Sequence, residues 1–83
     1  MKGSPTDIRD LKKGTQYRVQ RDFADYYQNQ FTQGELLTFV DSHFVPYHGG
    51  YTVIFKERTL YLQEEINSNI LGSLGDYLRT AAD

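Results

Sequence analysis

The chain has 83 residues, with seven tyrosines, five phenylalanines, no cysteine and a net charge of −2. This length accommodates one domain, and the lack of cysteine excludes a disulfide framework, a thiolate metal site and a cysteine nucleophile. No segment is apolar for the length of a membrane helix, and residues 1–10 lack the apolar core of a signal peptide, so we expect a cytoplasmic protein without membrane contact.

The charge is distributed unevenly along the chain. Residues 1–21 contain six basic and two acidic side chains, a net +4, whereas residues 22–83 contain three basic and nine acidic ones, a net −6. This asymmetry predicts a basic first strand that pairs with acidic neighbours, and it leaves an anionic partner open as an alternative.

The first part of the chain predicts one helical turn before the first strand. Residues 1–6 offer little to bury, so we expect a disordered lead before a single domain over residues 7–83. Residues 7–13 fit a short helical turn that places Ile8 and Leu11 on one face.

Alternation begins after Gly14. Residues 16–22 place Tyr17 and Val19 on one face, which predicts a half-buried first strand. The polar and aromatic residues from 23 to 33 predict a long loop.

The middle of the chain contains two apolar runs of strand composition, residues 35–41 and 51–56. The nine residues between them predict a loop, since Pro46 and two glycines punctuate it. Both faces of each run are largely apolar, which is typical of central strands covered on both sides. A fourth strand is predicted over residues 60–62, with Leu60 and Leu62 directed inward.

Beyond residue 66 the hydrophobic period becomes helical. The spacing predicts a helix over about residues 67–80, with Asn67 as N-cap and with Ile66 and Leu71 as a hydrophobic staple. Gly72 and Gly75 each weaken such a helix by up to about 1 kcal/mol, so packing against the sheet must hold it.

Together these elements predict a mainly β fold with a C-terminal α-helix. The sheet is expected to be a small SH3-like barrel, or a strongly bent antiparallel sheet of four or five strands. The side chains predicted to fill its interior are Tyr17, Val19, Phe23, Leu37, Phe39, Phe44, Val53, Phe55, Leu60, Leu62, Ile70, Leu74 and Leu78.

The sequence contains no standard catalytic or phosphate-binding motif. His43 and His48, with Asp41 nearby, are the closest approach to a metal site, but their spacing is not a recognised ligand pattern and there is no third histidine. Ser73 lies between glycines without the spacing of a nucleophile elbow. We therefore expect no enzyme activity, no catalytic residue, no metal and no cofactor, with a hydrolase or metal site at the two histidines as the least favoured alternative.

Aromatic side chains gather in the two predicted loops, Tyr26, Tyr27 and Phe31 in the first and Phe44 and Tyr47 in the second. If the loops meet at one end of the barrel, these side chains form an amphipathic protein-binding surface. The alternative is burial, which we favour for Phe44 and hold equally open for Tyr26 and Tyr27. The first functional hypothesis is a non-catalytic module, a monomer or weak homodimer, that binds an unidentified protein partner.

A second hypothesis is single-stranded nucleic-acid binding. Lys12, Lys13, Arg18 and Arg21 are interleaved with aromatic residues, as in barrels that track single strands. The acidic pI of about 5.6 argues against this reading, as do two aspartates inside the basic cluster.

The order of a strand, a loop that begins with Asp25 and Tyr26, and a strand after Gly34 and Glu35 resembles SH3-type barrels. The chain has no tryptophan and no Pro-x-x-Tyr before its last strand, so the resemblance does not imply a polyproline groove.

A closer resemblance covers about residues 11–55. The matching residues are Leu11, Gly14, Tyr17, Val19, Phe23, Asp25, Tyr26, Gly34, Glu35, Thr38, Phe39, Phe44, Pro46, Tyr47 and Gly50. In this spacing the chain resembles an uncharacterised bacterial family, domain-of-unknown-function family 3601. It departs from the pattern over residues 27–31, where a glycine turn is expected, and at Leu37, where a larger aromatic is expected. The resemblance implies an SH3-like barrel from a bacterium and no assigned activity or functional residue.

Overall fold

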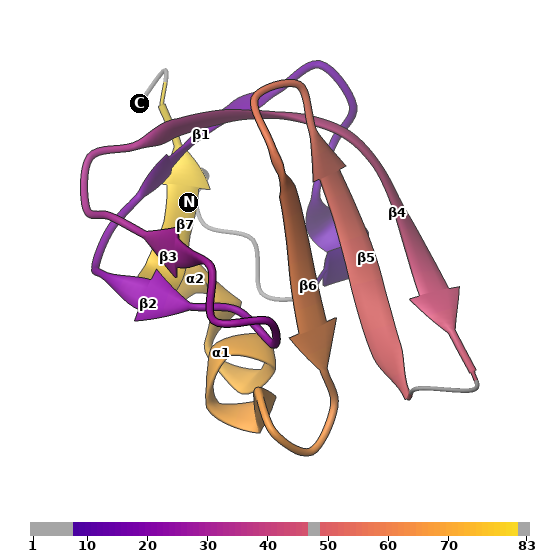
Figure 1. Cartoon of the computed structure of the whole chain (residues 1–83). Helices are drawn as coiled ribbons and strands as arrows, with labels where there is room; N and C mark the ends of the chain where they lie inside the picture. Colours follow the sequence, from indigo (N-terminus) through magenta and orange to yellow (C-terminus); the bar gives the residue numbers. More distant parts are fainter. Residues whose placement is uncertain (1–7, 47–48, 82–83) are drawn as a thin grey trace.

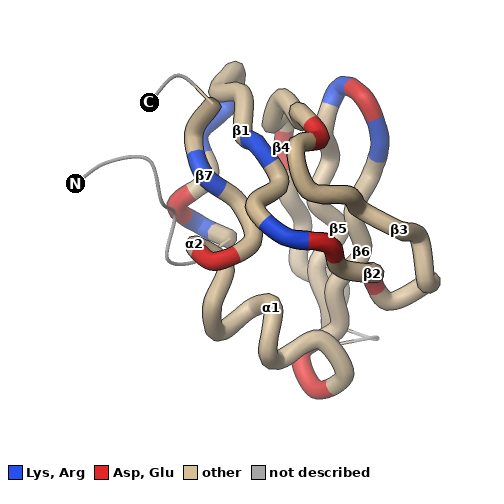
Figure 2. The backbone as a smooth tube through the Cα atoms, turned by 90° about the vertical axis from the view of Figure 1, so that its left-hand side faces the viewer, with Lys and Arg blue, Asp and Glu red and all other residues tan. Residues whose placement is uncertain are grey.

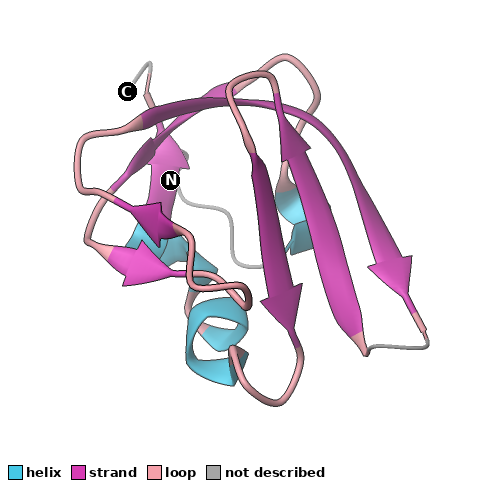
Figure 3. Ribbon diagram, in the orientation of Figure 1, coloured by secondary structure: helices cyan, strands magenta, loops and turns pink. Residues whose placement is uncertain are grey.

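The computed structural model describes residues 8–46 and 49–81, and combines a five-stranded antiparallel sheet with a two-stranded hairpin and short helices (Figures 1 and 3). The elements in chain order are η1 (Ile8–Asp10), β1 (Gln16–Val19), β2 (Phe23–Ala24), β3 (Gln30–Phe31), β4 (Leu36–Val45), β5 (Gly50–Phe55), β6 (Thr59–Gln63), α1 (Ser68–Gly72), α2 (Leu74–Tyr77) and β7 (Leu78–Thr80). The predicted mainly β fold with a strongly bent antiparallel sheet is confirmed. No described helix is long and apolar enough to cross a membrane. The predicted disordered lead, residues 1–6, lies outside the described residues.

The central strand β4 joins the two halves of the sheet, whose order is β6-β5-β4-β1-β7. Its first residues pair with β1, and its remaining residues pair with β5 from Asp41 to Val45. The register shifts between Phe39 and Asp41, and a bulge of this kind bends a strand. Figure 1 shows β4 curving across the molecule from the β1 side to the β5 side.

The interior is formed by side chains that alternate along the strands, together with side chains from the helices. Every residue predicted to lie inside is buried, with the exception of Phe44. Buried hydrophobic residues that the prediction omitted are Ile8, Leu11, Phe31 and Tyr77. Ile8 and Leu11 belong to the predicted first turn, whose shared apolar face is confirmed.

The expectation that both faces of the strand over residues 35–41 are covered is wrong. Leu37 and Phe39 are buried, but Leu36 and Val40 on the opposite face are exposed. Because no described helix or strand packs over that face, β4 has a single apolar side, as is common in antiparallel sheets.

Phe44 is 47% exposed, so its predicted place in the core is wrong. The predicted loop over residues 42–50 is also wrong, because β4 continues to Val45 and β5 begins at Gly50. Continued pairing with β5 keeps Phe44 extended beside Tyr51 instead of allowing the chain to fold back into the interior.

The region predicted as a loop over residues 23–33 contains the β2–β3 hairpin, and the first strand ends at Val19, not at residue 22. Phe31 is fully buried and stacks on Phe23, with 5.0 Å between ring centroids. The Arg58 guanidinium lies 4.0 Å from the centroid of the Phe31 ring. The expected role of Phe31 in a binding surface is therefore wrong, since the hairpin turns this ring inward.

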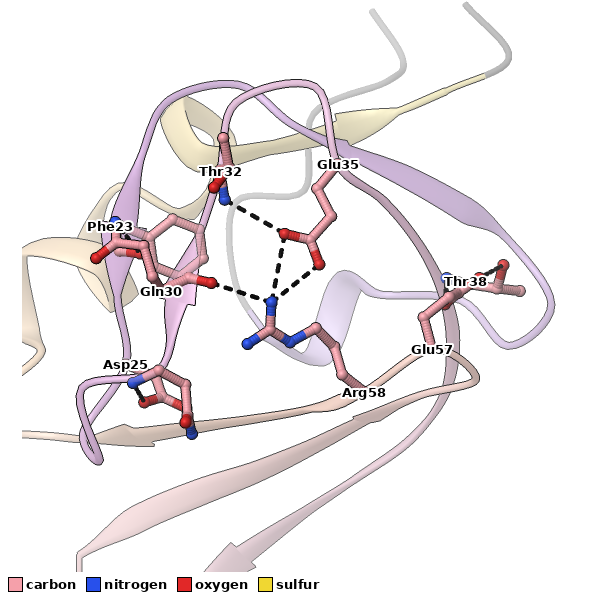
Figure 4. A network of polar contacts seen from close by, with 9 residues as sticks. Phe23, Asp25, Gln30, Thr32, Glu35, Thr38, Glu57 and Arg58 are labelled. Atoms are coloured by element: carbon pink, nitrogen blue, oxygen red, sulfur yellow. Dashed lines mark hydrogen bonds and ion pairs between the residues drawn. The ribbon is translucent and has the colours of Figure 1, made fainter.

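Arg58 also fixes the hairpin to the rest of the sheet (Figure 4). Its Nη1 donates to the carbonyl oxygen of Gln30 at 3.0 Å and lies 3.1 Å from Oε2 of Glu35. Glu35 Oε1 in turn accepts a hydrogen bond from the backbone N–H of Thr32. The Arg58 guanidinium thus joins the β5–β6 turn to β3 and to Glu35, the residue directly before β4.

The neighbouring Glu57 makes a similar link to β4. Its carboxylate accepts the backbone N–H of Thr38 at 2.7 Å and the Thr38 hydroxyl at 3.0 Å (Figure 4). These bonds, first of all the one from the Thr38 backbone, lower the pKa of Glu57 below its ordinary value.

The predicted continuous helix over residues 67–80 is wrong. The segment forms α1, α2 and the strand β7, which pairs with β1 through Val19 and Leu78. Low helix propensity at the two glycines, together with an open edge on β1, favours this division. Four of the helically spaced apolar residues are nevertheless buried, namely Ile70, Leu74, Tyr77 and Leu78.

The predicted cap of this helix also differs. Asn67 precedes α1, but its side chain makes no capping bond and instead accepts the backbone N–H of Gln63 at 2.8 Å. Ile66 is 63% exposed and so does not form the predicted staple with Leu71. The Asn67 side chain therefore closes the β6–α1 turn.

Gly50 lies where the backbones of β5 and β6 come too close for a side chain. A Cβ atom added there would lie 2.7 Å from the carbonyl oxygen of Leu62. We expect Gly50→Ala to lower the free energy of unfolding by about 1–3 kcal/mol, because the strands must separate. Gly72→Ala is the matched control: no atom lies within 4 Å of its added Cβ, and we expect it to stabilise the protein by about 0.5–1 kcal/mol. Urea denaturation measures both, and equal stability of the two variants contradicts this reading of Gly50.

Candidate functional site

The turn between β2 and β3 is organised around the carboxylate of Asp25. Its Oδ1 accepts the backbone N–H groups of Tyr27 and Asn29 at 3.0 and 2.9 Å. Gln28 has a φ of 68°, the left-handed region that glycine adopts most easily. This position lies within residues 27–31, where the family resemblance led us to expect a glycine turn.

Asp25 also attaches the turn to the edge of the main sheet. Its Oδ2 accepts the backbone N–H of Tyr61 in β6 at 3.2 Å, and the backbone N–H of Tyr26 donates to the Tyr61 carbonyl at 2.7 Å. Asp25 is only 1% exposed. The edge of β6 is thereby paired with the turn, which covers backbone groups that otherwise invite further strands.

This attachment gathers tyrosine rings on the surface of β6. The rings of Tyr26 and Tyr27 meet edge to face with 5.1 Å between centroids, and those of Tyr27 and Tyr61 do so at 5.0 Å. Tyr27 is 62% exposed, although it contacts both neighbours. Edge-to-face contacts fix the rings of an exposed surface without burying them.

Beside these rings lies a hollow of about 340 Å³, part of which is open solvent. It is lined by Tyr26, Tyr27, Val45, Gly50, Tyr51, Thr52, Tyr61, Leu62 and Gln63. We call it the tyrosine hollow. Among these described lining residues none carries a charge, so recognition there depends on apolar contact, hydroxyl groups and one amide.

The tyrosine hollow contains some of the predicted surface residues and omits others. Tyr26 and Tyr27 are exposed and line it, which settles the question of their burial. Phe44 lies next to it, 5.1 Å from the Tyr51 ring. Phe31 is in the core, and Tyr47 lies outside the described residues.

Tyr51 and Tyr61 were absent from the predicted surface. The strand pattern directs Tyr61 outward, which is the available signal. The contact that makes Tyr61 part of a site comes from the β2–β3 turn, more than thirty residues away in the chain, and no local pattern reports it.

The alternative metal site is only partly visible. Nε2 of His43 lies 3.8 Å from Oδ2 of Asp41, and both side chains are exposed. His48 lies outside the described residues. Within residues 8–46 and 49–81, no group of three or more potential metal ligands occurs.

No protein-family model matches the chain, and neither does any curated protein. The SH3-like assignment and the resemblance to domain-of-unknown-function family 3601 therefore stay predictions. Among solved structures, an integron cassette protein from the mobile metagenome of Vibrio cholerae is similar to this chain, with a TM-score of 0.80 and 28% sequence identity over 90% of each chain. The chain therefore shares the fold of an integron cassette protein.

Proposed function

We propose that the protein is a non-catalytic interaction module that binds a segment of another protein in the tyrosine hollow. The observation that carries this proposal is the convergence of four tyrosines from three separate elements on one uncharged depression. Tyrosine is enriched among residues that dominate binding energy, because its ring is rigid and its hydroxyl still forms hydrogen bonds.

The lining of the tyrosine hollow supports a shallow contact with an apolar side chain of a partner. Rings and aliphatic groups form most of its surface, and the tyrosine hydroxyls and the Gln63 amide are available to the partner's backbone. The similarity to the Vibrio protein supports a bacterial origin, and we propose that the module acts in the cytoplasm.

The test uses peptides selected from a random phage-displayed library against the wild-type protein. We expect the peptides to shift backbone NMR signals of Tyr26, Tyr27, Tyr51 and Tyr61, and we expect Tyr27→Ala to weaken binding at least about tenfold. Ile66→Ala is the control, since its side chain is as exposed as that of Tyr27 and lies outside the hollow. Equal losses in the two variants, or shifts confined to other surfaces, contradict the proposal.

A second candidate is binding of single-stranded nucleic acid, and one pairing favours it. Arg18 of β1 and Arg79 of β7 are register partners on neighbouring strands, and both are exposed. Figure 2 shows blue basic segments on both of the strands β1 and β7. Two exposed guanidinium groups on neighbouring strands are suited to contact the phosphates of a nucleic acid.

The remaining basic residues of this hypothesis are less concentrated. Lys12 and Lys13 are exposed before β1, while Arg21 lies 5.2 Å from the centroid of the Tyr77 ring. A fluorescence titration with oligothymidine decides the matter. Binding that falls steeply as salt rises and weakens in Arg18→Gln supports this candidate, and binding insensitive to salt dismisses it.

A further inference from the structure

Within the described residues, the second half of β4 has a strand on one side only. Residues 41–45 pair with β5, whereas pairing with β1 covers residues 36–38 and ends with backbone bonds at Phe39. In Figure 1 this half of β4 forms the outer border of the sheet, beyond β5. An unpaired strand edge presents N–H and C=O groups that are complementary to another strand.

The backbone groups at this edge follow from the alternation of hydrogen bonds across the sheet. The backbone N–H and C=O of Tyr61 point toward the β2–β3 turn, so the backbone groups of Leu60 and Leu62 point toward β5. The backbone groups of their partners in β5, Val53 and Tyr51, therefore point toward β6. Those of residues 50, 52 and 54 are left to point toward β4. From Asp41 onward, β4 and β5 pair residue for residue. The backbone groups of Asp41, His43 and Val45 therefore bond to β5, whereas the backbone N–H and C=O groups of Ser42 and Phe44 point away from β5.

The edge carries its own polar and apolar groups. The Ser42 N–H donates to Oδ1 of Asp41 at 2.8 Å, which protects this donor in the single chain. The Phe44 ring is 47% exposed, and the imidazole of His43 lies beside the same Asp41 carboxylate.

We propose that this edge pairs antiparallel with the same edge of a second copy of the chain, about a two-fold axis at His43. In this register Ser42 of each copy lies opposite Phe44 of the other, and their outward N–H and C=O groups form two reciprocal hydrogen-bonded pairs. Asp41 then releases the Ser42 N–H, which donates to the Phe44 carbonyl of the second copy.

The side chains in this register are complementary as well. Asp41 of one copy lies diagonal to His43 of the other on the same face, so a carboxylate meets an imidazole N–H donor across the interface. The two Phe44 rings are diagonal neighbours on the opposite face, about 7–8 Å apart at their backbones, within reach of aromatic side chains. A second copy therefore covers the exposed Phe44 ring and also supplies a hydrogen-bond donor to the Asp41 carboxylate, which has released the Ser42 N–H. Both contacts are made by residues of β4 alone. This pairing does not depend on the tyrosine hollow.

Disulfide trapping tests the register, since the native chain has no cysteine. In the proposed register, residue 43 of one copy lies opposite residue 43 of the other, in a pair without reciprocal hydrogen bonds. The side chains of such a pair are close enough for a disulfide to link them. We expect His43→Cys to form a linked dimer under mild oxidation at least about tenfold faster than Gln33→Cys, an exposed position before β4 and outside residues 41–45. Val45→Cys, which in this register faces Asp41 and not itself, is expected to react as slowly as Gln33→Cys.

A second pair of variants tests the edge itself in the His43→Cys background. Ser42→Pro removes a backbone N–H that points away from β5 and that donates to Oδ1 of Asp41 in the single chain. The hydrogen bonds between β4 and β5 are therefore kept, while pairing with a second copy is blocked. We expect Ser42→Pro to return trapping to the Gln33→Cys rate and Ser42→Thr to leave it unchanged, with circular dichroism verifying the fold. Equal trapping at residues 43, 45 and 33 overturns the proposal, as does trapping that survives Ser42→Pro.

Discussion

Replacing Asp25 by alanine is expected to lower the free energy of unfolding by about 3–4 kcal/mol, because three backbone N–H groups lose the buried carboxylate that accepts their hydrogen bonds. The loss detaches the β2–β3 turn from β6 and exposes the strand edge that the turn covers. Urea denaturation measures the stability change, and hydrogen exchange at the Tyr61 amide reports the local opening.

Asp25→Asn is the matched control for this effect. Its amide oxygen replaces Oδ1 as acceptor for Tyr27 and Asn29, so we expect about half of the destabilisation seen with alanine. A loss below about 1 kcal/mol for Asp25→Ala contradicts the role assigned to this carboxylate.

Phe31→Ala is expected to destabilise the protein by about 3–5 kcal/mol, the range found when buried phenylalanines are truncated. The substitution empties the space between Phe23 and the Arg58 guanidinium, so that the ring stack and the cation–π contact are lost together. Thermal and urea unfolding measure the loss.

Phe44→Ala is the comparison that separates core from surface. Its ring is half exposed and contacts Tyr51 alone among the described aromatic rings, so we expect a loss of only about 1 kcal/mol. Similar costs for the two phenylalanines contradict the assignment of Phe31 to the core and Phe44 to the surface.

Strand alternation predicted the interior well where a strand is long enough to repeat its period. Tyr17 and Val19, Leu37 and Phe39, and Leu60 and Leu62 all lie inside as expected. These pairs lie in strands of four or more residues, where one buried face imposes a period of two on the sequence.

The misplaced residues lie where distant contacts decide. Phe31 belongs to a two-residue strand in a polar stretch, and its burial depends on Phe23 and Arg58. Phe44 was assigned to a loop because Pro46 and glycines follow it, whereas pairing with β5 extends β4 almost to the proline. A two-residue strand has no measurable period, and pairing between strands is not encoded locally.

The candidate site was predictable only in part, because local patterns do not report contacts between distant residues. Tyr26 and Tyr27 were identified from their aromatic character in a polar loop. Tyr51 and Tyr61 join them only because Asp25 holds the turn against β6, a contact that depends on the completed sheet.

The pairing of β1 with β7 has a consequence for biosynthesis. Tyr17 is matched with Thr80, so an early strand receives its second neighbour from one of the last described residues. During translation, residue 80 has to leave the ribosome before β7 can pair with β1. Until then this edge of β1 stays unpaired, and an unpaired edge of this kind is a site that a chaperone can shield.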